Sequence, residues 1–154
     1  MRPSRTLTAM RTAWSWTKFG TFALAGVLVG AAMPSPSCRP LHLAPQSWTL
    51  ETLDGAHFAL PSGAKPPALT FDAKEKRVSG FTGCNNLTGS YAEDGSKLKF
   101  SPLATTRMAC EAPLGGLESS VLRALEQTTA FHIGCSTLEL RHGDTVLATL
   151  RTSR

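Results

Sequence analysis

The sequence lacks the residue patterns that mark the common classes of enzyme. It contains no phosphate-binding glycine loop, no dinucleotide-binding fingerprint, no Ser-His-Asp constellation and no pair of catalytic carboxylates. It also lacks C-x-x-C and H-x-x-H pairs, the spacings at which zinc ligands usually occur. We therefore expect a protein without enzymatic activity, bound metal or cofactor.

Acidic residues are absent from the first part of the chain. All 11 Asp and Glu residues follow residue 33, whereas four of the 16 basic residues precede the first apolar run. Removing those four leaves 12 basic residues against 11 acidic ones, so a mature chain that begins at Cys38 would be almost neutral. Clusters of Lys and Arg interleaved with aromatic residues are also missing. Such a chain is not expected to bind nucleic acid.

A long apolar run is missing as well, although a short one is present. Residues 2–18 are basic and precede an uncharged stretch at 19–33, which is shorter than the roughly 20 apolar residues of a membrane-spanning helix. This order predicts a signal peptide over residues 1–37 and export to the periplasm or cell envelope. An uncleaved leader is the alternative.

Cys38 directly follows the predicted signal peptide, and its role depends on where the leader is cut. Ser37 is small, as a bacterial lipoprotein signal requires, but Ser35 stands where an aliphatic residue is usual. Two alternatives therefore remain open. In the first, which we favour narrowly, Cys38 is lipidated and anchors the chain to a membrane. In the second, ordinary cleavage leaves four cysteines, and Cys38 bridges Cys135.

Beyond a tether at residues 38–46, the chain consists mostly of short segments separated by turn residues, the pattern of an antiparallel β fold. Four hairpins are expected from this pattern. Their segments are residues 48–53 with 57–60 around Asp54-Gly55, 68–72 with 77–81, 90–92 with 97–100, and 137–141 with 145–151. On the last strand, Val146, Ala148 and Leu150 are expected to share the inner face.

One segment follows a helical period instead. Apolar residues recur at three- and four-residue steps over residues 113–128, which predicts an amphipathic helix with Pro113 in its first turn. Val121 and Leu125 are central to its apolar stripe, whereas Glu118 is expected on the solvent face. The helix should pack on the concave side or across the open end of the sheet. The expected fold class is therefore mainly β with one packed helix (α+β).

The most informative stretch is SGFTGCNNLTGSY at residues 79–91, in which three glycines surround a Cys-Asn-Asn core. Glycine allows positive φ angles, and Asn side chains often bond their own backbone. The stretch therefore predicts a tight turn motif that includes Gly83, Asn85, Asn86 and Gly89.

Together with TTRMAC at residues 105–110, this motif carries a resemblance to a known family. The opening tryptophan strand, both motifs, the helix and the terminal hairpin make residues 47–151 similar to the META domain of the HslJ-like heat-shock lipoproteins. The resemblance implies a small antiparallel half-barrel with a packed helix, in a non-enzymatic, stress-associated envelope protein. It also implies a disulfide between Cys84 and Cys110, the cysteines that match the family's motifs.

Other roles for these cysteines are less favoured. A reactive Cys84 thiolate would need a base or cation beside it, and no sequence spacing places His132, His142 or Arg107 there. In an exported domain with a second cysteine available, a structural bridge is the better interpretation. Arg107 itself is interpreted as solvated or bonded to backbone rather than as a ligand-binding cation.

Two functions remain open at this point. The first is a monomeric, non-enzymatic envelope protein, with a membrane contact through its lipid or an unidentified envelope protein as partner. The alternative is a binder of a lipid or other small apolar ligand in a half-barrel pocket, with Trp48 and Tyr91 in its wall. An open apolar cavity of a few hundred Å³ would favour the ligand. We expect a filled core that contains both aromatic residues.

Overall fold

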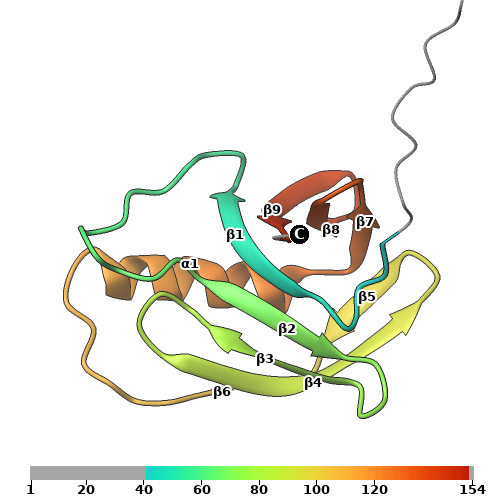
Figure 1. Ribbon diagram of the computed structural model, residues 1–154, viewed down its shortest axis with the longest axis horizontal. Helices are drawn as coiled ribbons and strands as arrows, with labels where there is room; N and C mark the ends of the chain where they lie inside the picture. The colour runs from blue at the N-terminus through green and yellow to red at the C-terminus, as the bar shows by residue number, and fades with distance from the viewer. Residues whose placement is uncertain (1–40, 153–154) are drawn as a thin grey trace, which may run out of the picture. The chain divides into compact units, whose positions relative to one another are not determined.

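Eight strands close into an antiparallel barrel in the computed structural model of the chain, which describes residues 41–152 (Figure 1). Neighbouring strands follow the order β3-β2-β1-β9-β8-β7-β5-β4, and β4 pairs back with β3. The mainly β fold with one helix is therefore confirmed, but the sheet is a closed barrel rather than a half-barrel. Closure gives both edges of each strand a hydrogen-bonded neighbour, which a half-barrel would not. The predicted signal peptide and Cys38 lie outside the described residues.

Nine strands and one helix follow each other within residues 41–152. They are β1 (Ser47–Leu53), β2 (Ala68–Asp72), β3 (Arg77–Phe81), β4 (Asn86–Asp94), β5 (Lys97–Phe100), β6 (Ala104–Thr105), α1 (Leu114–Gln127), β7 (Ala130–Ile133), β8 (Thr137–His142) and β9 (Thr145–Arg151). The short strand β6 pairs with the first half of β4 and stands outside the closed ring.

Three of the four expected hairpins are present, formed by β2 with β3, β4 with β5, and β8 with β9. Their turns have the chemistry that the sequence indicates. In the first, the Asp72 carboxylate accepts the backbone N–H groups of Lys74 and Glu75 at 2.8 and 3.0 Å. In the second and third, Gly95 and Gly143 have positive φ angles of 58° and 56°.

The return strand of the remaining hairpin is wrong. Asp54 and Gly55 do form a tight turn, with φ angles of 49° and 77° as in a type I′ turn. Leu53 and Ala56 bond each other's backbone across it. Residues 57–60 then leave the sheet, and β1 pairs instead with β2 through residues 47–49 and with β9 through residues 49–53. Pairing with distant strands has replaced the local hairpin.

A bulge in the last hairpin changes which residues face the core. The register between β8 and β9 shifts after Leu140, which leaves Leu147 as an extra residue on β9. Leu147, Ala148 and Leu150 are buried, whereas Val146 is half-buried. The expected inner position of Val146 is therefore wrong, since strict alternation assumes an unbroken register.

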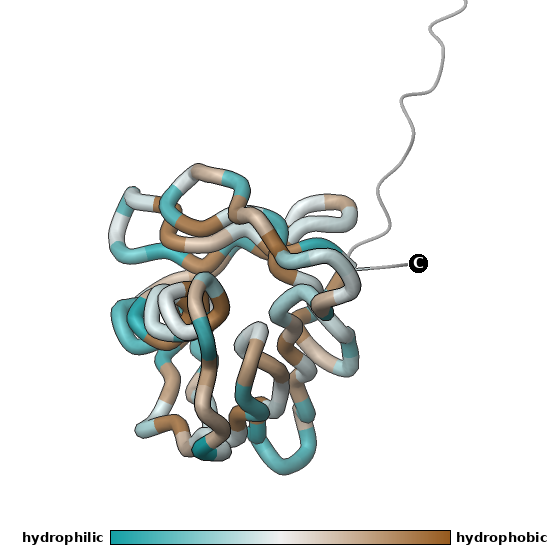
Figure 2. The backbone as a smooth tube through the Cα atoms, turned by 90° about the vertical axis from the view of Figure 1, so that its left-hand side faces the viewer, coloured by the Kyte–Doolittle hydropathy of each residue, from teal (hydrophilic) through white to brown (hydrophobic). Residues whose placement is uncertain are grey.

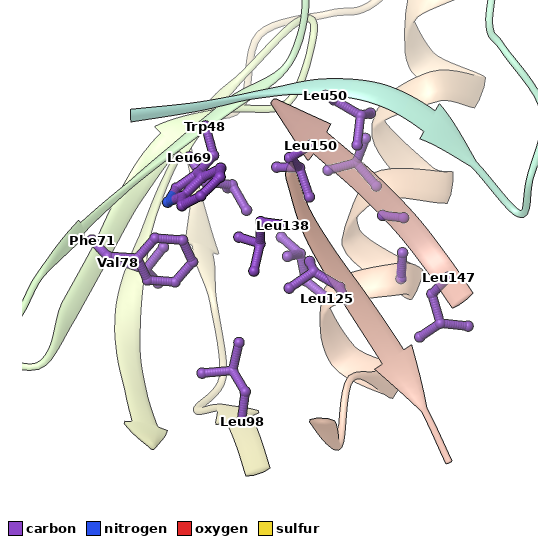
Figure 3. Packing of buried hydrophobic residues seen from close by; sticks show 14 of the residues in the cluster. Trp48, Leu50, Leu69, Phe71, Val78, Leu98, Leu125, Leu138, Leu147 and Leu150 are labelled. Atoms are coloured by element: carbon purple, nitrogen blue, oxygen red, sulfur yellow. The ribbon is translucent and has the colours of Figure 1, made fainter. Parts of the chain in front are cut away.

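The barrel interior is filled by apolar side chains from strands that are far apart in the sequence (Figure 3). Trp48 is completely buried and donates its Nε1–H to the carbonyl of Leu43 at 2.9 Å. Tyr91 is buried as well, and its ring meets that of Phe71 edge to face, with 5.2 Å between the centroids. Both aromatic residues thus belong to the core, as expected.

Residues 41–46, assigned above to the tether, pack against the barrel. Leu43 is only 2% exposed and belongs to the hydrophobic core, and its carbonyl accepts the indole hydrogen bond of Trp48. Gln46 contributes a backbone carbonyl to Phe71 N–H at 3.5 Å. The folded domain therefore includes residues that precede β1.

The expected helix is present as α1, whose 14 residues follow Pro113 at the N-cap. Its apolar stripe is buried, with Val121 and Leu125 at its centre, and the helix contacts β1, β5 and β8. Figure 2 shows its hydrophilic side turned outward and its hydrophobic side turned toward the barrel. Within residues 41–152, no helix has the length and apolar character needed to cross a membrane.

Candidate functional site

Cys84 and Cys110 form a disulfide, with their Cα atoms 6.0 Å apart. Cys84 lies in the turn between β3 and β4, and Cys110 lies in the loop between β6 and α1. The bridge therefore ties the barrel to the segment that enters the helix, and both cysteines are half-buried. Cys135 is also disulfide-bonded, so it is not a leftover thiol. The alternatives for Cys38 concern a residue outside the described part of the chain.

Thr82, rather than an asparagine side chain, holds the turn that carries Cys84. Thr82 Oγ1 donates to the carbonyl of Asn85 at 2.9 Å and accepts the Asn85 N–H at 3.0 Å. Gly83 has a φ angle of 105°, and a side chain there would lie 3.0 Å from Leu117 of α1. Gly83 is thus required for the turn, but the expectation that Asn85 bonds its own backbone is wrong.

The Asn85 side chain instead reaches across to the loop that precedes the helix. Its Oδ1 accepts the hydroxyl of Thr106 at 2.7 Å and the backbone N–H of Met108 at 2.8 Å. Its Nδ2 donates to Glu118 Oε2 at 2.8 Å and lies 3.2 Å from Cys110 Sγ. Because Asn85 is only 4% exposed, these partners replace water. We call Asn85, Thr106, Met108, Glu118 and the disulfide the Asn85 cluster.

Glu118 belongs to this cluster, and its expected position on the solvent face is wrong. It is half-buried, it accepts the Asn85 amide, and its Oε2 lies 3.1 Å from Cys110 Sγ. Helical periodicity places Glu118 on the solvent face of α1, but Asn85 and the loop between β6 and α1 cover it there. The period alone could not reveal that loop.

Asn86 and Gly89, which were expected in the turn, belong to β4. Asn86 pairs with Phe81 of β3, and its N–H donates to Thr106 Oγ1 at 3.1 Å. Gly89 lies beside the segment between β5 and β6, and a Cβ atom at Gly89 would be 2.5 Å from the Leu103 side chain. Gly89 therefore permits a close approach rather than a turn.

An open groove of about 340 Å³ lies beside the disulfide. Both cysteines line it, together with apolar Phe81, Met108 and Leu114 and charged Lys65 and Glu111. Met108 is 61% exposed, the large hydrophobic side chain that residues 41–152 leave in solvent. The disulfide is therefore reachable from outside, and most of the residues that line the groove are apolar.

The other candidate side chains do not converge on this groove. His132 is an exposed residue of β7, and His142 Nδ1 lies 2.9 Å from the Gln127 carbonyl. Arg107 is exposed. Nothing brings these three side chains together with Cys84 among the described residues.

The Asn85 cluster also contains three groups of the kind that bind metals. Three possible ligand atoms lie within 4.8 Å of one another, one each from Cys84, Cys110 and Glu118. Metals bind cysteine as thiolate, and both sulfurs are joined in the disulfide. In this state only the Glu118 carboxylate is available, which does not make a metal site.

The barrel interior leaves almost no free space. The cavity between Leu50, Leu140 and Leu150 of the strands and Val121 and Leu125 of the helix measures about 10 Å³. Tyr91, which was a candidate wall residue, donates its hydroxyl to the Asp72 carbonyl at 3.2 Å. Burial, with smaller effects of nearby Glu93 and Asp72, raises the pKa of Tyr91.

Sequence reasoning missed Thr82, Thr106 and Glu118 as members of this region. Thr82 and Thr106 lie in or next to the two motifs, so their short polar side chains were a usable signal. No sequence signal marked Glu118, because its partners become neighbours only when the loop folds over the helix.

Comparisons with known proteins agree with this architecture. The family model of the META domain matches residues 41–154. An NMR structure of a protein from Burkholderia xenovorans is 31% identical, with a TM-score of 0.56, over 80% of this chain and 96% of that chain. A second NMR structure is 25% identical, with a TM-score of 0.55, over 70% of this chain and 88% of the other.

A more distant similarity concerns the fold alone. The crystal structure of a DUF4847 family protein from Bacteroides vulgatus is 12% identical, with a TM-score of 0.52, over 71% of this chain and 93% of that chain. No curated protein matches the chain.

Proposed function

Because the chain belongs to the META domain family, we propose that it is a non-enzymatic protein of the bacterial cell envelope that acts in the response to stress. The observation that carries the proposal is the bridge between Cys84 and Cys110. Disulfides persist in oxidising compartments such as the bacterial periplasm and are rare in the cytosol. The bridge therefore supports export, which the basic and apolar leader at residues 2–33 also predicts.

The filled barrel supports a role that the protein surface carries out. Pockets for small ligands usually measure about 300–1,000 Å³ and bury most of the ligand. The interior cavity of about 10 Å³ has no room for a lipid chain or other apolar molecule. We therefore do not propose the ligand-binding alternative.

The state of the cysteines favours ordinary cleavage of the leader. Lipidation of Cys38 would leave Cys135 as the leftover thiol, but Cys135 is disulfide-bonded. We therefore favour a mature chain that keeps all four cysteines of the sequence. Lipid anchoring of Cys38 is the competing outcome of the test below.

Cell fractionation of a bacterium that expresses the full-length chain tests export directly. The expected result is a shortened chain in the periplasmic fraction, whose intact mass corresponds to four cysteines in two disulfides. A chain in the membrane fraction with an acylated Cys38 would retain export and replace ordinary cleavage by lipidation. The matched control is Leu24→Arg, which places a charge in the apolar stretch and should leave the chain uncut in the cytoplasm. Export is contradicted if the wild-type chain behaves like this control.

A deletion strain of the source bacterium tests the stress role. Loss of the protein should lower survival after heat shock, and the wild-type gene should restore it. The Leu24→Arg chain should fail to do so, because it does not reach the envelope. Equal survival of all strains would contradict a role in stress.

A further inference from the structure

We propose that the Cys84–Cys110 disulfide is a reversible thiol–disulfide exchange site in which Glu118 carries the proton of Cys110. The inference goes beyond the envelope function, since it gives the bridge a reaction with dithiol proteins. The exchange is stoichiometric: the chain is one reactant and does not turn over a substrate. Three features of the Asn85 cluster carry the proposal.

The first feature is access. The disulfide lines an open groove of about 340 Å³, and exposed Met108 and half-buried Phe81 and Leu114 surround it. Thiol–disulfide exchange needs access to a disulfide sulfur, which this groove provides. A bridge that served structure alone would not need to face an open groove.

The second feature is a difference between the two sulfurs. Glu118 Oε2 lies 3.1 Å and Asn85 Nδ2 lies 3.2 Å from Cys110 Sγ, whereas Asn85 Nδ2 is 3.9 Å from Cys84 Sγ. In the bridge neither sulfur carries a proton. After reduction, the Cys110 S–H is within hydrogen-bonding distance of the Glu118 carboxylate. Cys110 is therefore the sulfur with an adjacent base, as nucleophilic thiols require.

The third feature keeps the two thiols together when the bridge is open. Asn85 follows Cys84 directly, and its side chain binds Thr106 and Met108 of the loop that carries Cys110. Strand β6 also remains paired with β4. These hydrogen bonds do not depend on the disulfide, so the reduced cysteines stay close enough to close again.

The reaction balances as an exchange with a dithiol. A thiol of the dithiol gives its proton to Glu118 and attacks Cys84 Sγ as a thiolate, the Cys84–Cys110 bond breaks, and Cys110 keeps the electron pair and takes the proton from Glu118. The second thiol of the partner then displaces Cys84, which leaves as a thiol. Two electrons and two protons pass from the dithiol to the chain, and the dithiol becomes a disulfide.

Closure runs in reverse and uses Glu118 as the base. The Cys110 thiol gives its proton to Glu118, and its sulfur attacks Cys84 Sγ in the mixed disulfide. The departing partner thiolate takes the proton from Glu118, which regains its carboxylate form.

The charged residues nearest to the disulfide come from three segments. Lys65 and Glu111 line the groove beside it, and exposed Arg107 lies in the loop between β6 and α1. Glu118 forms no ion pair within residues 41–152, and its hydrogen-bond donor is the neutral amide of Asn85. Its carboxylate is therefore not already committed to a cation.

Reoxidation of the reduced mature protein by oxidised glutathione tests the role of Glu118. Alkylation and peptide mapping would follow Cys84 and Cys110 separately from the other cysteines. Glu118→Gln should slow closure about tenfold near pH 6 and match wild type near pH 9, where thiolates form without a base. The amide oxygen still accepts from Asn85, so the fold is kept, which circular dichroism would verify. Glu126→Gln, on an exposed position of the same helix, should stay within about twofold of wild type.

Two results would overturn the proposal. One is a Glu118→Gln rate near pH 6 that equals or exceeds wild type. The other is that dithiothreitol fails to reduce the Cys84–Cys110 bridge in the folded protein without denaturant, since a partner protein could then not reach the disulfide either. Neither result bears on export, which fractionation tests separately.

Discussion

The barrel interior and the Asn85 cluster differ in how their residues are selected. Interior positions are apolar side chains that recur with the period of a strand or helix, and their attraction has no direction. The cluster joins single polar groups from a turn, a loop and a helix, and each donor needs a specific acceptor. Substitutions inside the barrel should therefore lower stability through lost packing. Substitutions in the cluster should lower it by leaving buried polar groups without a hydrogen-bond partner.

The largest expected effect is in the interior, at Leu125. Leu125→Ala removes a side chain that is 2% exposed and packed against the strands, so it should lower the free energy of unfolding by about 2–5 kcal/mol. Urea unfolding measures this change. Arg123→Ala, two positions away on the exposed side of α1, should cost less than about 0.5 kcal/mol. Equal midpoints for both variants would place Leu125 outside the core.

A smaller but comparable effect is expected at Asn85. Asn85→Ala leaves the Met108 N–H, the Thr106 hydroxyl and the Glu118 carboxylate without their partner, so the cost should be about 2–3 kcal/mol. Asn86→Ala is the matched control, since no side-chain hydrogen bond of the exposed Asn86 is present among residues 41–152. If the two variants unfolded at the same urea concentration, the Asn85 contacts would contribute nothing to stability.

The smallest expected effect is at Glu118, where the structure and the helical periodicity predict different losses of stability. Glu118→Ala removes the acceptor of the buried Asn85 amide, and should cost about 1–2 kcal/mol. Helical periodicity alone predicts less than about 0.5 kcal/mol, as for a residue on the solvent face. Glu126→Ala provides that reference on the same helix. Identical losses of stability for the two variants would show that Glu118 lies on the solvent face.

Local patterns predicted the parts of the fold that depend on neighbouring residues. The hairpin of residues 68–81, the amphipathic helix and the buried Trp48 all follow from alternation, turn residues or helical period. The pairing of β1 with β9 joins residues 49–53 to residues 148–151, and no local sequence pattern predicts this pairing. Closure of the barrel was missed for that reason.

The candidate site was predictable only where a motif carried it. The two motifs with Cys84 and Cys110 led to the disulfide through the family resemblance. The partners of Asn85 could not be derived, because a buried amide is satisfied by whichever groups the fold brings to it. Glu118 shows the same limit, since its burial depends on a loop and not on its helical position.

Amide hydrogen exchange at Met108 tests most directly whether the Asn85 cluster holds the loop without help from the disulfide. The Met108 N–H bonds to Asn85 Oδ1 at 2.8 Å, although its side chain is exposed. We predict that this amide stays protected when the disulfide is reduced and loses protection in Asn85→Ala with the disulfide intact. Exchange at the rate of an unstructured peptide after reduction alone would contradict the claim, since the disulfide and not Asn85 would then hold the loop.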